Sequence, residues 1–291
     1  MLHQHGTPRM LGAARILVYT LWLINVIILP LEDLAAMPLE IQRQMGIMRH
    51  LPDAAWAAIH SFEALVALRV VVAAGLVWLV IGLPRYRSVA IATCILLTLF
   101  DGIVKGYGYV THSKFVLLYA AWILAFFPAT DALALPRRPE PQATPRHALP
   151  LVVIALLLFT SYFFVGALRI DRSGVAILFS DTLRTNLLVR SLEPNPTGFG
   201  GGLLIASHAP LMWMANIGFA AVGIAELLSP LCLAQRWVRR GWLAVIVPFH
   251  VAVLLTMNIA FWENVALLAL FGVDWSARRP QPELLQQSAR E

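Results

Sequence analysis

The chain has 291 residues, of which 59% are hydrophobic and only 13% are charged, and its mean hydropathy is +0.73. So little polar surface excludes an ordinary soluble domain and predicts an all-α, polytopic integral membrane protein. The net charge of +6 does not indicate nucleic-acid binding, because the arginines lie in short stretches between apolar runs rather than in a soluble basic segment.

Eight apolar runs follow one another along the chain. A transmembrane helix needs ~20 predominantly apolar residues, and most of the runs approach that length, whereas the last is short enough to be a half-span. The sequence therefore predicts a single membrane domain over residues 1–291 with about 7–8 transmembrane helices. The runs are 11–31, 62–82, 88–105, 114–128, 149–168, 207–233, 241–260 and 265–273.

Three segments between the runs are more polar. "EDLAAMPLEIQRQMGIMRHLPDAAWAAIHS" and "DRSGVAILFSDTLRTNLLVRSL" alternate apolar and charged residues at helical intervals, which predicts amphipathic helices at the outer membrane interface. "ALPRRPEPQATPRHALP" is rich in proline, which predicts an irregular cytoplasmic linker at about 129–148 between two helical halves.

Basic residues indicate the orientation of the chain. They gather in every second loop, close to span ends, which by the positive-inside rule predicts that both termini are cytoplasmic. On this topology Arg169 ends the fifth run on the outer side, and Glu226 lies near the inner end of the sixth. The residues that set the orientation are Arg85, Arg87, Arg137, Arg138, Arg146, Arg236, Arg239, Arg240, Arg278 and Arg279.

Ionisable side chains inside the runs are costly, by roughly 2.5 to 3.5 kcal/mol each on insertion scales. Each is therefore internally paired or functional. Most of them fall in the outer half of the predicted membrane, which predicts a polar pocket that faces outward. They are Arg69, Asp101, Lys105, His208, Glu226, His250 and Glu263.

Several of these side chains also have structural interpretations. Asp101 and Lys105 are four residues apart, so they can neutralise each other on one helix face. Arg69 can pair with an acidic neighbour or extend its guanidinium to the interface. Glu226 can cap its helix or pair with Arg236.

The run "PFHVAVLLTMNIAFWEN" carries His250 and Asn258. Eight residues along a helix separate two side chains by about 80° and ~12 Å, so the two share a broad face without touching. Lipid cannot satisfy their hydrogen bonds, which favours the wall of a polar cavity. His250 alone could equally be a hydrogen-bonding residue between helices.

Several kinds of site have no sequence support. The eight histidines lack a paired ligand spacing, so no metal site is predicted. Cys94 and Cys232 lie in apolar runs without a C-x-x-C spacing, which leaves a dithiol mechanism without support. No nucleotide-binding loop or nucleophile elbow is present.

Separate segments resemble those of one membrane family in the expected order. "PFHVAVLLTMNIAFWENVALLALF" is similar to a late span that opens with an aromatic residue and a histidine. "HSKFVLLYAAWILAFFPATDAL" and "SYFFVGALRI" are similar to two earlier spans, and "ARILVYTLWLI" and "MGIMRHLP" fit the N-terminal region. The chain thus resembles the HTTM (horizontally transferred transmembrane domain) family, to which the membrane domain of vitamin K-dependent gamma-carboxylase and its bacterial relatives belong.

This resemblance implies a bacterial inner-membrane protein with gamma-carboxylase-like lyase or oxidoreductase chemistry and a reduced quinone as cofactor. It places Arg169 where the carboxylase has its catalytic lysine. Arginine stays protonated in proteins, so it is a poor general base, but it binds carboxylates and phosphates well. This departure argues against carboxylation itself and gives Arg169 the role of an anion anchor.

The leading hypothesis is a membrane-embedded enzyme-like protein that acts on a lipophilic cofactor, a lipid or a peptide in the outward-facing pocket. His250 is predicted to donate a hydrogen bond or carry a proton beside Arg169. The predicted pocket lining is Asn258, Tyr162, Asp101, Lys105, His112, Arg69, His208 and Glu263. Two alternatives stay open: a non-enzymatic maturation or assembly partner, and a transporter of small molecules or lipids.

Overall fold

A computed structural model describes residues 7–42, 46–106, 112–136, 139, 141–174, 176, 179–192 and 199–272. All regular structure among these residues is helical, as the composition predicts. The chain divides into two compact units, which we call the N-terminal unit (described residues up to 154) and the C-terminal unit (described residues 155–272). The division falls inside one long helix, α7 (Pro145–Ser173), ten residues beyond its start rather than in the proline-rich linker that precedes it.

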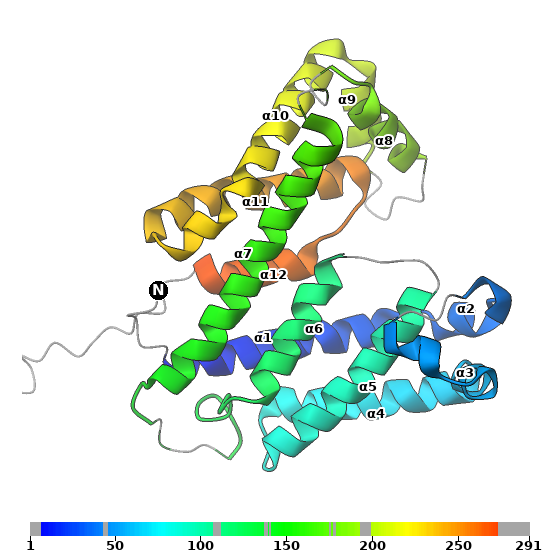
Figure 1. Cartoon of the computed structure of the whole chain (residues 1–291), viewed down its shortest axis with the longest axis vertical. Helices are drawn as coiled ribbons and strands as arrows, with labels where there is room; N and C mark the ends of the chain where they lie inside the picture. Colours follow the sequence, from blue (N-terminus) through cyan, green and yellow to red (C-terminus); the bar gives the residue numbers. More distant parts are fainter. Residues whose placement is uncertain are drawn as a thin grey trace, which may run out of the picture. The chain divides into compact units, whose positions relative to one another are not determined.

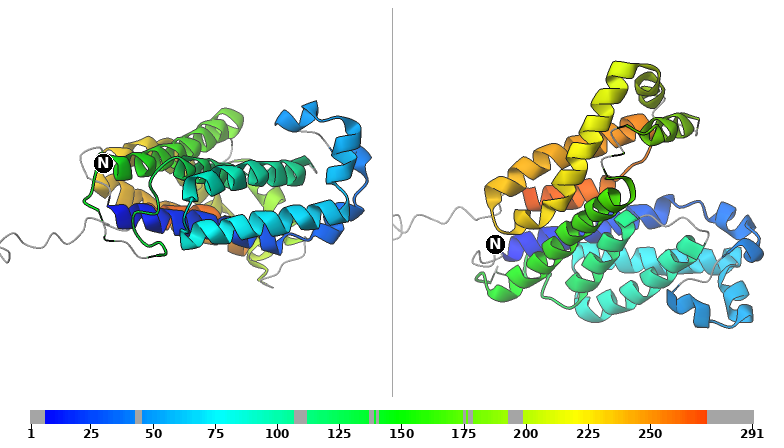
Figure 2. Two further views of the ribbon diagram at one scale, coloured as in Figure 1. Left: turned by 90° about the horizontal axis from the view of Figure 1, so that it is seen from below. Right: turned by 45° about the horizontal axis from the view of Figure 1, so that its top comes forward.

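Four long helices form the body of the N-terminal unit: α1 (Pro8–Ile28), α4 (Phe62–Ile81), α5 (Tyr86–Gly106) and α6 (His112–Ala125). Helix α4 packs against both α1 and α5, and α6 packs against α1 and α5, as Figures 1 and 2 show. The described residues between α1 and α4 form short pieces, α2 (Leu31–Ala36), η1 (Leu39–Ile41), η2 (Gly46–His50) and α3 (Asp53–Ile59). The interfacial helix predicted over 32–61 is therefore broken into four turns.

The ends of these helices follow local rules. The hydroxyl of Thr7 caps α1 by accepting a hydrogen bond from the Met10 amide at 3.1 Å, with proline next in the sequence. Ser61 caps α4 in the same way. Helix α4 ends at Gly82, whose φ of +77° is a left-handed conformation that glycine adopts without strain.

The C-terminal unit contains the rest of α7, α8 (Thr182–Ser191), α9 (Gly201–Ser207), α10 (Ala209–Leu227), η4 (Ser229–Leu233), α11 (Arg236–Met257) and α12 (Trp262–Gly272). Helix α11 contacts α8, α9, α10, η4 and α12 and is the centre of this unit. The predicted run at 207–233 forms two pieces, α10 and η4, and each has a proline, Pro210 or Pro230, in its first turn.

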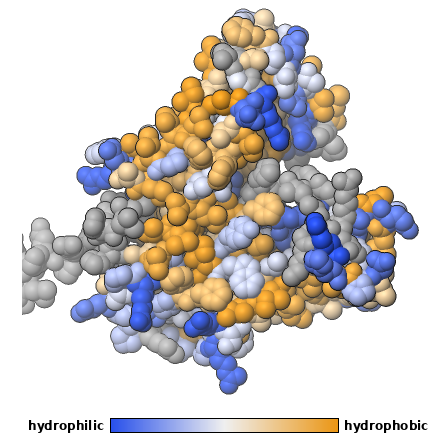
Figure 3. Space-filling model, in the orientation of Figure 1, coloured by the Kyte–Doolittle hydropathy of each residue, from blue (hydrophilic) through white to orange (hydrophobic). Residues whose placement is uncertain are grey.

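Six of the described helices are long and apolar enough to cross a membrane: α1, α4, α5, α7, α10 and α11. Helices α6 and α12 are apolar but shorter. Only 22% of the most apolar window, in α4, is buried, and the surface over the long helices in Figure 3 is largely hydrophobic. An apolar surface of this kind is not stable in water, which indicates a multi-pass membrane protein.

Candidate functional site

Two predicted site residues meet in the C-terminal unit. The hydroxyl of Tyr162 on α7 lies 2.6 Å from Nε2 of His250 on α11, and both side chains are buried. The ring of Trp242 packs edge-on against Tyr162, with centroids 5.0 Å apart. The indole of Trp242 donates a hydrogen bond to the carbonyl of Ala225 at 2.7 Å, which links α11 to α10. The sequence named Tyr162 and His250 as site residues but could not pair them.

Arg169 forms a buried ion pair with Glu226. Its Nε and Nη2 atoms lie 3.0 Å and 3.1 Å from the two carboxylate oxygens. The guanidinium also lies 3.9 Å from the ring centre of Phe219. The interpretations of Glu226 as a helix cap or a partner of Arg236 were therefore wrong, because its carboxylate is held by an arginine from α7.

The close approach of α7 and α10 depends on two glycines. A Cβ at Gly166 would lie 2.8 Å from the Cβ of Glu226 and from the amide of Leu227, and one at Gly223 would lie 3.1 Å from Cδ of Arg169. Each glycine lets the other helix come near enough for the ion pair to form.

The ion pair corrects the predicted depth of these helices. The sequence placed Arg169 at the outer side of the membrane and Glu226 near the inner side, but atoms 3 Å apart share one depth. Just after the end of α10, the hydroxyl of Ser229 donates a hydrogen bond to the carbonyl of Phe159 in α7 at 2.7 Å. Helix α10 therefore overlaps only the C-terminal half of α7.

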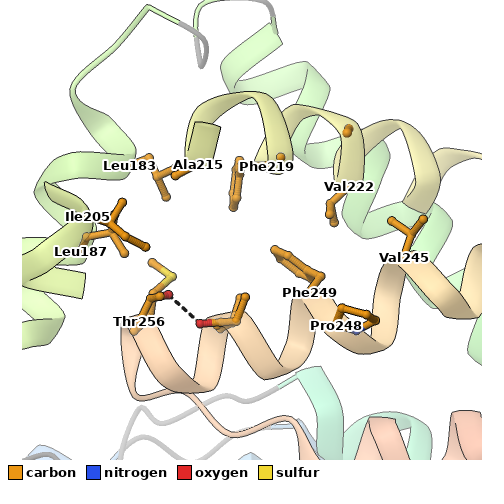
Figure 4. Close-up of a pocket in the computed structure, with 15 residues that line it drawn as sticks. Leu183, Leu187, Ile205, Ala215, Phe219, Val222, Val245, Pro248, Phe249 and Thr256 are labelled. Atoms are coloured by element: carbon orange, nitrogen blue, oxygen red, sulfur yellow. Dashed lines mark hydrogen bonds between the residues drawn. The ribbon is translucent and has the colours of Figure 1, made fainter. Parts of the chain in front are cut away.

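An apolar pocket of about 430 Å³ lies beside this cluster in the C-terminal unit. In Figure 4 its side chains come from α8, α9, α10 and α11 and point into a common space. Thr256 supplies the hydroxyl in the wall, and this group already donates to the carbonyl of Ala252 at 2.7 Å. The lining residues are Leu183, Leu187, Ile205, Ala215, Gly218, Phe219, Ala221, Val222, Val245, Pro248, Phe249, Ala252, Val253, Thr256 and Met257.

The pocket differs from the predicted polar cavity, because none of the predicted site residues lines it. Phe219 and Phe249 connect the pocket to the polar cluster of Arg169 and His250. Both rings line the pocket, and the guanidinium of Arg169 lies 3.9 Å from the first ring centre and 5.8 Å from the second. The ring of His250 also packs against Phe249, with centroids 5.6 Å apart.

Two buried donor or acceptor atoms of this cluster have neither a hydrogen bond nor an ion-pair contact among the described residues. They are Nδ1 of His250 and Nη1 of Arg169. The His250 side chain is only 6% exposed, and a buried polar atom without a partner is costly. Such atoms are where the polar group of a bound molecule would be expected.

The other predicted residues of this unit lie elsewhere. Asn258 ends α11 in a left-handed conformation, with its backbone amide bonded to the carbonyl of Leu254. Glu263 is buried in the first turn of α12. His208 is exposed in the turn between α9 and α10, where its Nδ1 lies 2.9 Å from the carbonyl of Leu204.

The remaining predicted residues belong to the N-terminal unit. Asp101 and Lys105 pair on α5 as their spacing predicted, and the ammonium lies 3.7 Å above the Phe115 ring. Arg69 donates to the carbonyl of Leu29, so neither predicted acidic partner holds it. His112 begins α6, but its side chain lies outside the described residues.

Arg15 and His147 are two of the buried polar residues of the N-terminal unit that the sequence did not single out. Arg15 is 0% exposed and donates to the carbonyls of Leu79, Val80, Ala129 and Leu133. Because α4 ends there, these include carbonyls without a partner inside the helix, and Gly82 beyond α4 was the available signal.

The second missed group is His147 in the first turn of α7. Its Nε2 lies 2.9 Å from a carboxylate oxygen of Asp131. Its Nδ1 lies 2.9 Å from the hydroxyl of Thr144 and accepts a hydrogen bond from the backbone amide of Thr144 at 3.2 Å. The threonine and the histidine three residues later match the spacing of a capping box, which ties the linker to the start of α7.

The chemistry of the C-terminal cluster is limited by its atoms. Within the described parts of the chain, no group of three or more metal-binding side chains occurs. The Tyr162–His250 pair can hold or pass a proton, whereas Arg169 is neutralised by Glu226.

No family model matches this chain, and neither a curated protein nor a solved structure matches it.

Proposed function

We propose that this protein is a multi-pass membrane protein that binds a lipophilic molecule in the pocket between α8, α9, α10 and α11. The observation that carries the proposal is a preformed apolar pocket of about 430 Å³ beside a buried polar cluster. Small-molecule pockets typically enclose ~300 to 1,000 Å³ and combine apolar walls with a few polar groups.

The lining favours an apolar body for the ligand. The wall carries no charged side chain, and the hydroxyl of Thr256 is already bonded within α11. A water-soluble ligand would lose its hydration there without new hydrogen bonds. An apolar chain or ring system that already resides in lipid has no hydration shell to lose when it enters the pocket.

The polar cluster favours a small polar group on the same ligand. His250 has one ring nitrogen bonded to Tyr162 and one without a partner among the described residues. A ligand hydroxyl or carbonyl that reaches Nδ1 would give both ring nitrogens of His250 a hydrogen bond. The Tyr162–His250 pair could then move a proton to or from the ligand. In this proposal His250 is the proton carrier and Tyr162 orients its ring.

The resemblance to the HTTM family gives this proposal its finer form. A reduced quinone would combine an isoprenoid chain, which suits the apolar lining of the pocket, with a polar ring whose hydroxyl groups could bond to Nδ1 of His250. Arg169 stands at the position of the family's lysine but is paired with Glu226, so we assign it a structural and electrostatic role. The arginines near the span ends support a bacterial inner-membrane location with both termini in the cytoplasm.

The test is mass spectrometry of lipophilic molecules that co-purify with the protein. Gly218→Phe is the blocking variant, because Gly218 lines the pocket and its added Cβ would meet no atom within 4 Å. Gly241→Phe is the matched control: a Cβ there also meets no atom within 4 Å, and Gly241 does not line the pocket. Both changes remove a glycine from an apolar helix.

We expect one stoichiometric lipophilic molecule in the wild type and in Gly241→Phe, and its loss from Gly218→Phe. The same bulk lipids in all three proteins would contradict the proposal. A molecule that remains in Gly218→Phe would show that binding occurs outside this pocket.

A second function, a non-enzymatic assembly partner, is favoured by one observation. Both polar pairs of the cluster join different helices, α7 to α11 and α7 to α10, as purely structural contacts would. In that case His250→Leu lowers thermal stability while the content of co-purified molecules stays unchanged. A ligand lost from His250→Leu at unchanged thermal stability favours the binding function.

A further inference from the structure

The α8–α11 pocket, which is formed by α8, α9, α10 and α11, is open on one side. Five of its lining residues are also exposed at the surface. Two of them, Gly218 and Ala221, lie three residues apart on α10. The others, Val245, Pro248 and Ala252, lie three and four residues apart on α11. Such spacings place residues on one face of a helix. The five residues therefore form a rim between α10 and α11, which we call the mouth of the pocket.

The other end of the pocket is closed. In Figure 4, Leu183 and Ala215 lie together at one end of the pocket, and Val245 lies at the other. Leu183 and Leu187 are only 6% and 2% exposed, and Ala215 packs against the buried apolar cluster to which they belong. The pocket is therefore a blind recess that is entered through its mouth.

The mouth lies at the depth of the acyl chains. Helices α10 (Ala209–Leu227) and α11 (Arg236–Met257) are both long and apolar enough to cross a membrane. Gly218 is at the midpoint of α10, and the three mouth residues of α11 lie in the middle of that helix. The middle of a transmembrane helix lies in the hydrocarbon core of the bilayer. Ile217 and Val251, next to the mouth residues in sequence, are 57% and 48% exposed, so the surface around the mouth is apolar as well.

The volume of the pocket limits how much of a ligand it can hold. A group the size of a water molecule takes about 30 Å³. The pocket of about 430 Å³ therefore has room for about 14 non-hydrogen atoms. A lipid with a long acyl or isoprenoid chain has several times as many. Only one end of such a molecule fits inside, and the rest has to project through the mouth, where acyl chains surround it.

We propose that the α8–α11 pocket opens sideways into the bilayer and takes one end of a long-chain membrane lipid. The remainder of the chain stays among the lipids outside the mouth. This inference rests on the proposed function and adds the class of ligand and its route: the molecule reaches the pocket from the membrane and not from water.

The experiment measures how fast a cysteine at the closed end of the pocket is modified. Ala215→Cys is reconstituted into phosphatidylcholine vesicles after detergent exchange has removed any co-purified molecule, which mass spectrometry verifies. N-cyclohexylmaleimide dissolves in the bilayer, whereas the charged reagent 2-(trimethylammonium)ethyl methanethiosulfonate stays in water. Cys94 and Cys232 are both 0% exposed, and the wild-type protein gives their background.

We expect N-cyclohexylmaleimide to modify Ala215→Cys and the charged reagent to leave it unmodified. Adding Gly218→Phe narrows the mouth and should slow the modification severalfold, since Gly218 lines the pocket with no atom within 4 Å of an added Cβ. Gly241→Phe, which does not line the pocket, should leave the rate unchanged. Val251→Cys, exposed on α11 outside the pocket, should react at the same rate with and without Gly218→Phe.

Three results would overturn the sideways opening. Equal modification by the charged reagent would show that the pocket opens to water. An unchanged rate in the Gly218→Phe background would place the entrance elsewhere. A thiol that reacts only after denaturation in dodecyl sulfate would show a closed recess. A co-purified molecule of no more than about 14 non-hydrogen atoms would overturn the long-chain ligand.

Failure of this inference can be told apart from failure of the proposed function. If all proteins carry the same bulk lipids but Ala215→Cys reacts as expected, the opening exists and the binding function is wrong. If a stoichiometric molecule co-purifies but the charged reagent modifies Ala215→Cys equally fast, the binding function stands and the sideways route is wrong.

Discussion

The Arg169–Glu226 pair gives the sharpest test of the C-terminal unit. Glu226 is 2% exposed, the side chain of Arg169 is 16% exposed, and two nitrogen–oxygen contacts of 3.0 Å and 3.1 Å join them. Removing one partner of a buried ion pair leaves an uncompensated charge and costs about 3–5 kcal/mol. We therefore expect a large loss of stability from either single substitution.

The two single variants should lose different amounts of stability. Glu226→Leu leaves a guanidinium that is partly exposed and still lies on the Phe219 ring, so we expect a loss at the lower end, about 3 kcal/mol. Arg169→Met leaves a carboxylate with almost no access to solvent, so we expect a loss near the upper end, about 5 kcal/mol. The first loss corresponds to a more than hundredfold change in the unfolding equilibrium.

The double variant Arg169→Met/Glu226→Leu removes both charges together. Replacing a buried pair by apolar residues is often neutral or stabilising, but the contact with Phe219 is also lost and contributes about 2 kcal/mol when desolvated. We expect the double variant to lie within about 2 kcal/mol of the wild type. Its loss should be smaller than that of either single variant.

The assay is equilibrium unfolding of the purified protein in mixed detergent micelles, followed by circular dichroism, with Arg172→Met as an exposed control on α7. The control should change stability by less than about 0.5 kcal/mol. Additive losses in the double variant would refute the ion pair, because uncoupled side chains show no interaction energy in a double-mutant cycle.

Three further predictions concern other contacts. Gly166→Ala should destabilise the protein by about 1–3 kcal/mol in the same unfolding assay, because its Cβ would lie 2.8 Å from the backbone of α10. Arg15→Met should cost at least about 3 kcal/mol and lower the melting temperature, because four backbone carbonyls lose their donor. Burial lowers the pKa of His60, which lies in the turn between α3 and α4, despite the hydrogen bond to the carbonyl of Trp56. As the pH falls, His60 is therefore protonated in the unfolded chain before it is protonated in the folded protein. The free energy of unfolding should then fall below about pH 6.5, by up to about 1.4 kcal/mol per pH unit. His60→Gln should remove this pH dependence from a series of unfolding curves.

Most of the long apolar helices were predictable because apolar composition alone determines them, whereas the runs at 114–128 and 265–273 form the shorter helices α6 and α12. The runs at 62–82 and 88–105 correspond to α4 and α5 within a few residues. The break of the run at 207–233 was also readable, since Pro210 and Pro230 begin new helical pieces. The predicted interfacial helices depended on weaker periodicity, and the described residues of 32–61 form four short helical pieces.

The partners of the buried polar residues were mostly not predictable. Asp101 and Lys105 are close in sequence, so helical spacing was sufficient to pair them. Glu226 and Arg169 are 57 residues apart, and their contact depends on the register of two helices at Gly166 and Gly223. Nothing in a single sequence fixes that register. The predicted topology even placed the two residues on opposite sides of the membrane.

Hydrogen bonds to backbone carbonyls explain why polar residues inside the apolar runs need not line a pocket. Arg15 and Arg69 donate to carbonyls at helix ends, and no pattern of side chains in the sequence predicts such contacts. In lipid every such donor must find an internal partner, so most intramembrane charges can be structural without any acidic residue nearby. What indicates a site is therefore an unsatisfied polar atom next to a pocket, since unsatisfied atoms such as Nε of Arg69 also occur away from the α8–α11 pocket. Nδ1 of His250 and Nη1 of Arg169 meet that condition, and both side chains lie against aromatic rings that line the apolar pocket. This coincidence, rather than the number of charged residues in the spans, is the reason to look for a ligand in the C-terminal unit.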